Sequence, residues 1–72
     1  MRIHGNEVLW KSEKENVAVA FNKFDLGNKY KVYRKVSYLP ENFRMWELLI
    51  SFGTMGEATS YAKKIYDVLV MR

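Results

Sequence analysis

The chain has 72 residues, no Cys, one His and a formal net charge of +4. This length allows one domain with a small core, and the lack of Cys excludes disulfides and thiolate metal ligands. Because 49% of the residues are apolar and only one is Pro, we expect a folded chain rather than a disordered one. We therefore predict a single domain over residues 1–72.

The N-terminal residues mix polar and apolar side chains, so we expect neither a signal peptide nor a membrane anchor. No apolar run approaches the ~20 residues of a spanning helix. These features predict a cytoplasmic protein without a membrane partner.

The positive charge is concentrated in one half of the chain. Residues 1–38 carry eight Lys or Arg against four acids, whereas residues 39–72 carry four of each. A basic excess on one part of a protein indicates an anionic partner such as nucleic acid. A charge of +4 is also ordinary for the solubility of a small domain, so both explanations stay open.

The first two predicted strands are short. Glu7–Lys11 is one, with Val8 and Trp10 on one face, and the polar residues after it form a turn. Asn16–Phe24 is the next. Both of its faces are apolar, so alternation does not say which face meets the core. Asp25–Asn28 then predicts a hairpin turn, because Gly and Asn tolerate the positive φ that tight turns need.

The third predicted strand, Lys29–Tyr38, separates two kinds of residue. One face carries Tyr30, Val32, Arg34, Val36 and Tyr38, and the other carries Lys31, Tyr33, Lys35 and Ser37. A turn at Leu39–Asn42 follows, because Pro40 cannot continue a central strand.

The fourth predicted strand, Arg44–Phe52, alternates with a period of two. Trp46, Leu48, Ile50 and Phe52 form one set, and Met45, Glu47, Leu49 and Ser51 form the other. We expect Trp46 and Ile50 to face the helix. The alternative is a helix that begins near Pro40 and ends at Gly53; the aromatic and β-branched content favours the strand.

The last element is a helix from Met55 to about Val70. Thr54 and Glu57 have the spacing of a capping box. One helix face is apolar, with Ala58, Tyr61, Ala62, Ile65, Val68 and Leu69. The fold class is therefore α+β: an antiparallel meander of three to four strands, in the order ββββα, with the helix on one sheet face. The other face is expected to be open to water.

No catalytic or metal-binding motif is visible. His4 is the only near-neutral base, and no neighbouring nucleophile or ligand accompanies it. Gly53 and Gly56 match the GxxG spacing of RNA-binding KH loops, but a strand end followed by a helix cap explains both glycines. We predict a non-enzymatic protein without a cofactor.

The best candidate site is the face of Lys31, Tyr33 and Lys35. Cations interleaved with an aromatic ring suit phosphates together with a stacking contact. Asn22 or Lys23, together with Arg44, would extend this site on neighbouring strands. Met45, Leu49 and Phe24 are expected to add apolar surface there, which also suits a protein partner.

One family resemblance concerns the strand-to-helix junction. The run Phe52–Ala58, followed by Tyr61-Ala62-Lys63-Lys64, resembles the end of the AP2-like N-terminal domains of phage and transposon integrases. That resemblance implies a three-stranded sheet with a C-terminal helix, which binds duplex DNA through its open face. The family usually has a Lys in the helix cap, and this chain has none.

Two functions therefore remain open. The first is nucleic-acid binding, with duplex DNA as the expected partner. The second is a protein–protein module, such as a phage- or plasmid-type regulator or inhibitor that binds a host protein, or a homodimer formed through the same face.

Overall fold

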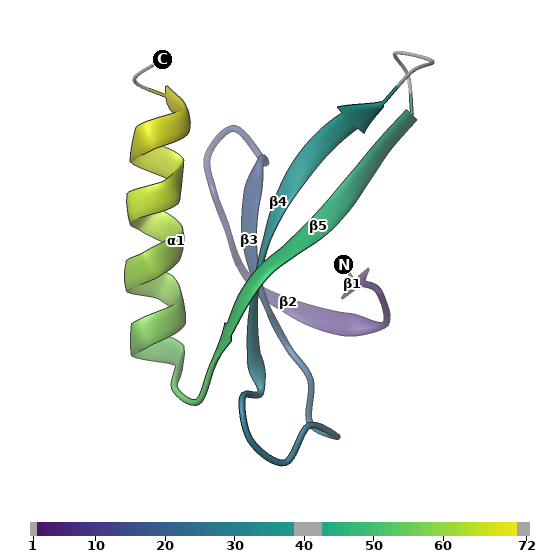
Figure 1. Ribbon diagram of the computed structural model, residues 1–72, viewed down its shortest axis with the longest axis vertical. Coiled ribbons are helices and arrows are strands. Elements are labelled where there is room, and N and C mark those ends of the chain that lie inside the picture. Colours follow the sequence, from purple (N-terminus) through teal and green to yellow (C-terminus); the bar gives the residue numbers. More distant parts are fainter. Residues whose placement is uncertain (1, 39–42, 71–72) are drawn as a thin grey trace.

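The computed structural model describes residues 2–38 and 43–70, with the side chains of residues 37, 38, 43 and 44 left aside. The sheet has five antiparallel strands in the order β1-β2-β3-β4-β5, followed by one helix (Figure 1). The elements are β1 (Arg2–Ile3), β2 (Asn6–Lys11), β3 (Val17–Phe21), β4 (Tyr30–Tyr38), β5 (Phe43–Phe52) and α1 (Met55–Val70). The α+β meander with a C-terminal helix is confirmed.

The strand prediction for Arg44–Phe52 is also confirmed, because β5 covers this segment and no helix forms there. The predicted turn at Leu39–Asn42 lies outside the described residues. No helix in the described part of the chain is long and apolar enough to cross a membrane.

The strand count differs from the prediction because a fifth strand, β1, precedes the others. Ile3 pairs with Asn6, so only His4 and Gly5 connect β1 to β2. Both residues have positive φ, 51° and 80°, as the central residues of a type I′ hairpin must. The positive φ expected at the 25–28 turn is absent, because the β3–β4 connection spans residues 22–29 and is not a two-residue turn.

A β-bulge in β2 reverses the predicted facing of its side chains. Val8 lies opposite Ala20, and Trp10 lies opposite Val19, so Leu9 is the extra residue. An extra residue shifts the alternation by one position. Val8 therefore packs on one face of the sheet and Trp10 on the other, and the prediction of a shared face is wrong.

A second bulge has the same effect in β5. Ile50 lies opposite Val32 and Leu48 lies opposite Tyr33, which leaves Leu49 as the extra residue. Leu49 packs against the helix side of the sheet, whereas Trp46 packs on the other side. The expectations that Trp46 faces the helix and that Leu49 lies on the open face are both wrong.

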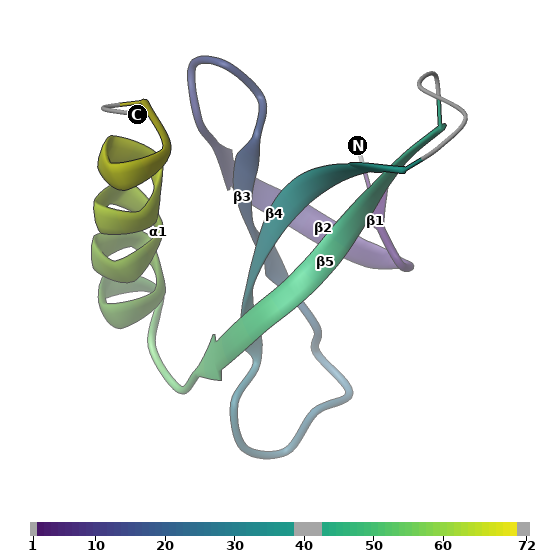
Figure 2. The same ribbon diagram turned by 45° about the horizontal axis from the view of Figure 1, so that its top comes forward.

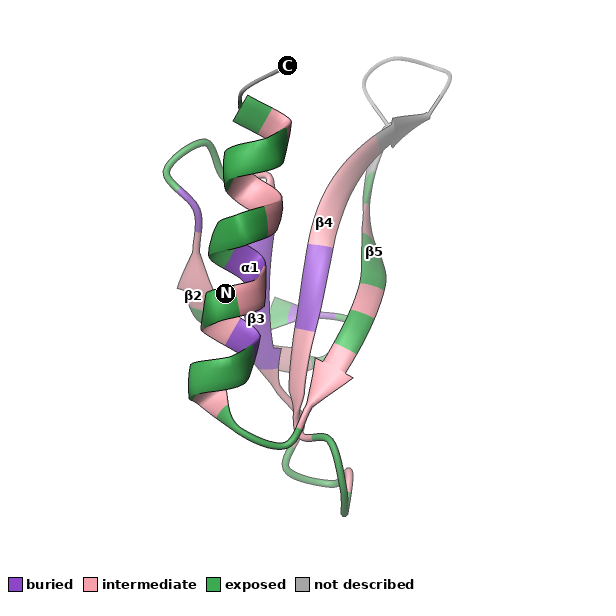
Figure 3. Cartoon of the chain, turned by 60° about the vertical axis from the view of Figure 1, so that its left-hand side comes forward, coloured by how far each residue is buried: buried purple, intermediate pink, exposed green. Residues whose placement is uncertain are grey.

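The sheet has a hydrophobic core on each face. The helix side holds Val17, Val19, Val32, Ala58 and Ala62, and the far side holds Ile3, Ala18, Ala20 and Tyr33. Residues 17–20 of β3 are all completely buried, which explains why both faces of this strand are apolar. Figure 3 shows the buried colour along β3, behind the helix.

The far face is not open, because the sheet curls and its N-terminal hairpin crosses that face. Figure 2 shows β1 and β2 passing behind β4 and β5. His4, at the tip of this hairpin, places Nε2 3.0 Å from the carbonyl oxygen of Trp46 in β5. The expectation of a solvent-exposed second face is wrong.

The helix begins at the predicted cap, although the Glu57 carboxylate accepts from the Thr54 hydroxyl instead of the Thr54 backbone amide. The Glu57 amide donates to the Thr54 hydroxyl oxygen at 3.3 Å, and that hydroxyl donates to the Glu57 carboxylate at 2.9 Å. The cap satisfies one of the amides that have no partner within the first turn.

Thr54→Ala is expected to lower the free energy of unfolding by about 1 kcal/mol, because it removes this cap. A urea titration followed by circular dichroism measures the change. Thr54→Ser, which keeps the hydroxyl, should stay close to the wild type. Equal losses in both variants would contradict a capping role.

Candidate interaction surfaces

The predicted site residues of β4 share a face, but that face is covered. Lys31, Tyr33 and Lys35 lie opposite Ser51, Leu48 and Trp46 of β5. Tyr33 is only 4% exposed. Its place at the centre of the far core removes the ring from any stacking contact with a ligand.

Tyr33 is held by the N-terminal hairpin. Its hydroxyl accepts a hydrogen bond from the Asn6 side-chain amide at 2.9 Å. The ring centroid of His4 lies 5.6 Å from that of Tyr33. The predicted role of Tyr33 as an exposed aromatic is therefore wrong, and the residue links β4 to the strands that cover it.

Lys31 is engaged in an ion pair. Its ammonium lies 2.5 Å from Asp25 Oδ2, and its side chain is 13% exposed. The hydrogen bonds from Lys31 and from the Gly27 amide hold the pKa of the Asp25 carboxyl below its ordinary value. Lys31 therefore anchors the 22–29 loop and is poorly placed to bind a phosphate.

The other predicted cations lie apart from one another. The Lys35 ammonium is 5.0 Å from the ring centroid of Trp46, a cation–π contact. Lys23 is exposed on the 22–29 loop, with its ammonium 5.2 Å from the ring centroid of Phe24. Arg44 belongs to β5 opposite Ser37, and its side chain lies outside the described part of the structure.

The described part of the structure has two main exposed apolar surfaces, and the first lies along the edge strand β5. Met45, Leu48 and Ile50 are 42%, 50% and 39% exposed. In the described sheet β5 pairs with β4 alone, so its other backbone edge has no strand neighbour. The one charged residue between Met45 and Phe52, Glu47, pairs with Arg34 at 3.2 Å.

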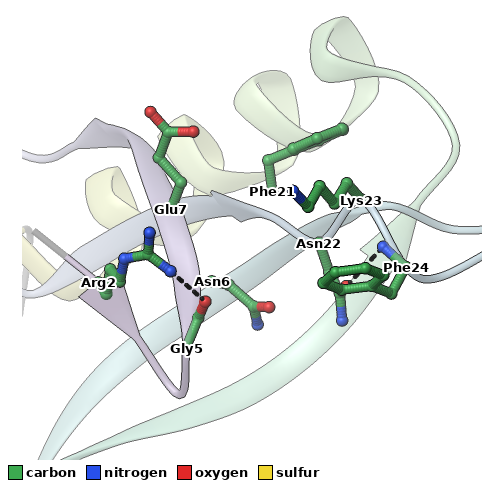
Figure 4. A pocket seen from close by; sticks show the side chains of 8 residues that line it. All are labelled: Arg2, Gly5, Asn6, Glu7, Phe21, Asn22, Lys23 and Phe24. Carbon is green, nitrogen blue, oxygen red and sulfur yellow. Dashed lines mark hydrogen bonds between the residues drawn. The ribbon is translucent and has the colours of Figure 1, made fainter.

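A second apolar surface is the loop between β3 and β4. Phe24 and Leu26 are 82% and 96% exposed. A shallow notch of about 170 Å³ lies beside Phe24 (Figure 4). It is lined by residues from β1, β2, the first hairpin, the end of β3 and this loop: Arg2, Gly5, Asn6, Glu7, Phe21, Asn22, Lys23 and Phe24.

Neither surface has the composition of a metal site. Among the described residues, no three His, Asp or Glu side chains come together as metal ligands. His4 contacts Trp46 and Tyr33, so it holds the first hairpin against β4 and β5.

No protein-family model, curated protein or solved structure matches the chain. The resemblance to the AP2-like integrase domains stays a prediction. The face that this resemblance implies for DNA binding is the covered one.

The roles of the first hairpin and of the loop tip were not predicted from the sequence. A His-Gly pair between Ile3 and Asn6 is the signal for the hairpin, since both residue types tolerate positive φ. For the loop, the signal is two apolar residues within a turn that is otherwise polar, Phe24 and Leu26.

Proposed function

We propose that the chain is a small non-enzymatic protein–protein interaction module that acts through the outer edge of β5. The observation that supports it is a long edge strand with exposed apolar side chains and no strand neighbour in the described sheet. Exposed strand edges pair readily with another strand unless charges, Pro or a covering element protect them. A strand added to such an edge gains backbone hydrogen bonds and side-chain contacts together.

The partner that fits this edge best is a second copy of the chain. Two β5 edges related by a two-fold axis would pair antiparallel and bury their exposed apolar residues. Glu47 forms an ion pair with Arg34. Pairing two β5 strands would therefore not bring two unpaired Glu47 carboxylates together at the centre of the interface. His4 covers the edge at the Trp46 carbonyl, which leaves the stretch around Leu48 as the contact region.

Leu48→Lys is expected to prevent this association, because it places a charge in the apolar contact of each copy. Light scattering at tens of micromolar should report a dimer for the wild type and a monomer for Leu48→Lys. The matched control is Leu9→Lys, a leucine on β2 of similar exposure (44%). A monomeric wild type, or loss of the dimer in both variants, would contradict the proposal.

Nucleic-acid binding is now supported by charge alone. Its predicted face holds a buried Tyr33 and a paired Lys31. Binding to duplex DNA whose affinity falls steeply with salt would revive that prediction. An affinity carried by β5 would depend little on salt.

A further inference from the structure

The most exposed large apolar side chains among the described residues belong to one short loop. Phe24 is 82% exposed and Leu26 is 96% exposed. The loop projects from the lower end of the molecule in Figure 1, and Figure 3 shows most of it in the exposed colour. Apolar groups that are this exposed and this close together favour an apolar environment outside the domain.

This loop is held in shape by its own hydrogen bonds. The Asn22 amide donates to the Lys29 carbonyl at 2.8 Å and closes the base. The Phe24 amide donates to Asn22 Oδ1 at 2.9 Å, and the Gly27 amide donates to Asp25 Oδ1 at 3.0 Å. The two apolar side chains are therefore presented by an ordered turn, which lowers the entropy cost of binding.

The charges around the tip are mainly positive. Lys23 and Lys29 flank the two apolar residues, and neither forms an ion pair with a described residue. The acid of the loop, Asp25, is neutralised by Lys31 at 2.5 Å. Arg2 and Lys23 both line the notch beside Phe24, where Glu7 is the one acid (Figure 4).

We propose that this loop binds the surface of an anionic phospholipid membrane, a partner that the sequence did not lead us to expect. Phe24 and Leu26 would enter the boundary between headgroups and acyl chains, while Lys23, Lys29 and Arg2 contact the headgroups. Two exposed apolar side chains flanked in the chain by Lys23 and Lys29 match the layering of such a surface, with anionic groups outside and hydrocarbon beneath. A nucleic acid would satisfy the cations but would offer no apolar environment to Leu26.

The proposal predicts weak, reversible binding, because only two apolar side chains insert. It is independent of the β5 edge. Co-sedimentation with phosphatidylcholine vesicles, with and without phosphatidylserine, tests it directly. The wild type should bind the phosphatidylserine vesicles more tightly, and the difference should shrink as salt rises.

Two double variants remove the two parts of the site. Phe24→Ser with Leu26→Ser should weaken the partition coefficient about tenfold or more, because the apolar transfer is lost. Lys23→Glu with Lys29→Glu should weaken it by a factor of about 25 or more, at about fivefold for each cation lost. All four sites lie outside both cores, so the melting temperature should stay close to that of the wild type.

Matched double variants on the helix test whether vesicle binding depends on this loop or only on net charge and exposed apolar surface anywhere on the protein. Lys63→Glu with Lys64→Glu also takes the net charge from +4 to zero, because each exchange lowers it by two. Val68→Ser with Val70→Ser removes two other exposed apolar groups, 53% and 41% exposed. Both helix variants should bind the vesicles much as the wild type does.

Four results would overturn the proposal. The first is a wild type that binds no phosphatidylserine vesicles at low salt. The second is a pair of loop variants that bind as the wild type does. The third is an equal loss in the loop and helix variants, which would indicate attraction by net charge without a site. The fourth is a set of loop variants that lose binding to a protein partner but not to vesicles. That result would place Phe24 and Leu26 in a pocket of that protein instead of in a membrane.

Discussion

Tyr33→Ala should lower the free energy of unfolding by about 3–5 kcal/mol, the range for an aromatic side chain removed from a core. Tyr33 is 4% exposed and packs with Ile3, Ala18 and Ala20. A domain this small has a total stability of about 5 kcal/mol. Much of the variant should therefore be unfolded without denaturant, which a urea titration followed by circular dichroism would show.

Tyr33→Phe is the matched control for the hydroxyl. It keeps the ring and removes the acceptor of the Asn6 amide, so a loss of about 1 kcal/mol is expected. A Tyr33→Ala variant as stable as the wild type would mean that the first hairpin does not cover β4. The ring would then be available to a ligand, as the sequence suggested.

Leu49→Ala is expected to cost about 2–4 kcal/mol, whereas Ile50→Ala should cost less than about 1 kcal/mol. Leu49 packs against the helix-side core, and Ile50 is 39% exposed beside it. Thermal or urea unfolding of the two variants gives the comparison. Because the residues are adjacent and similar in size, the difference reports how deeply each side chain is buried at the bulge.

The bulge is the reason for this expected order. Strict alternation from Phe52 puts Ile50 on the helix side and Leu49 on the other. The register shift between Val32 and Tyr33 instead brings Leu49 to the helix side as well. A larger loss for Ile50→Ala than for Leu49→Ala would place the bulge elsewhere in β5.

Local sequence signals were enough to predict the order and positions of most elements. The helix bounds Met55–Val70 follow from a local capping box and an apolar period of 3.6, and the structure has the same bounds. The four predicted strands appear within a few residues of their expected limits. These signals are local, so they can be read from neighbouring residues without knowledge of the fold.

Local signals did not predict which side chains reach each surface, because this depends on how the strands pair and pack. One extra residue in β2 and one in β5 reverse the alternation beyond them, and the pattern of apolar residues does not reveal where such a residue falls. The exposure of Tyr33 depends on Asn6 and His4, which are distant in the chain and reach it through the curl of the sheet. The Lys31–Tyr33–Lys35 face was therefore predicted with the correct residues and the wrong surroundings, because burial is a property of the packed sheet and not of one strand.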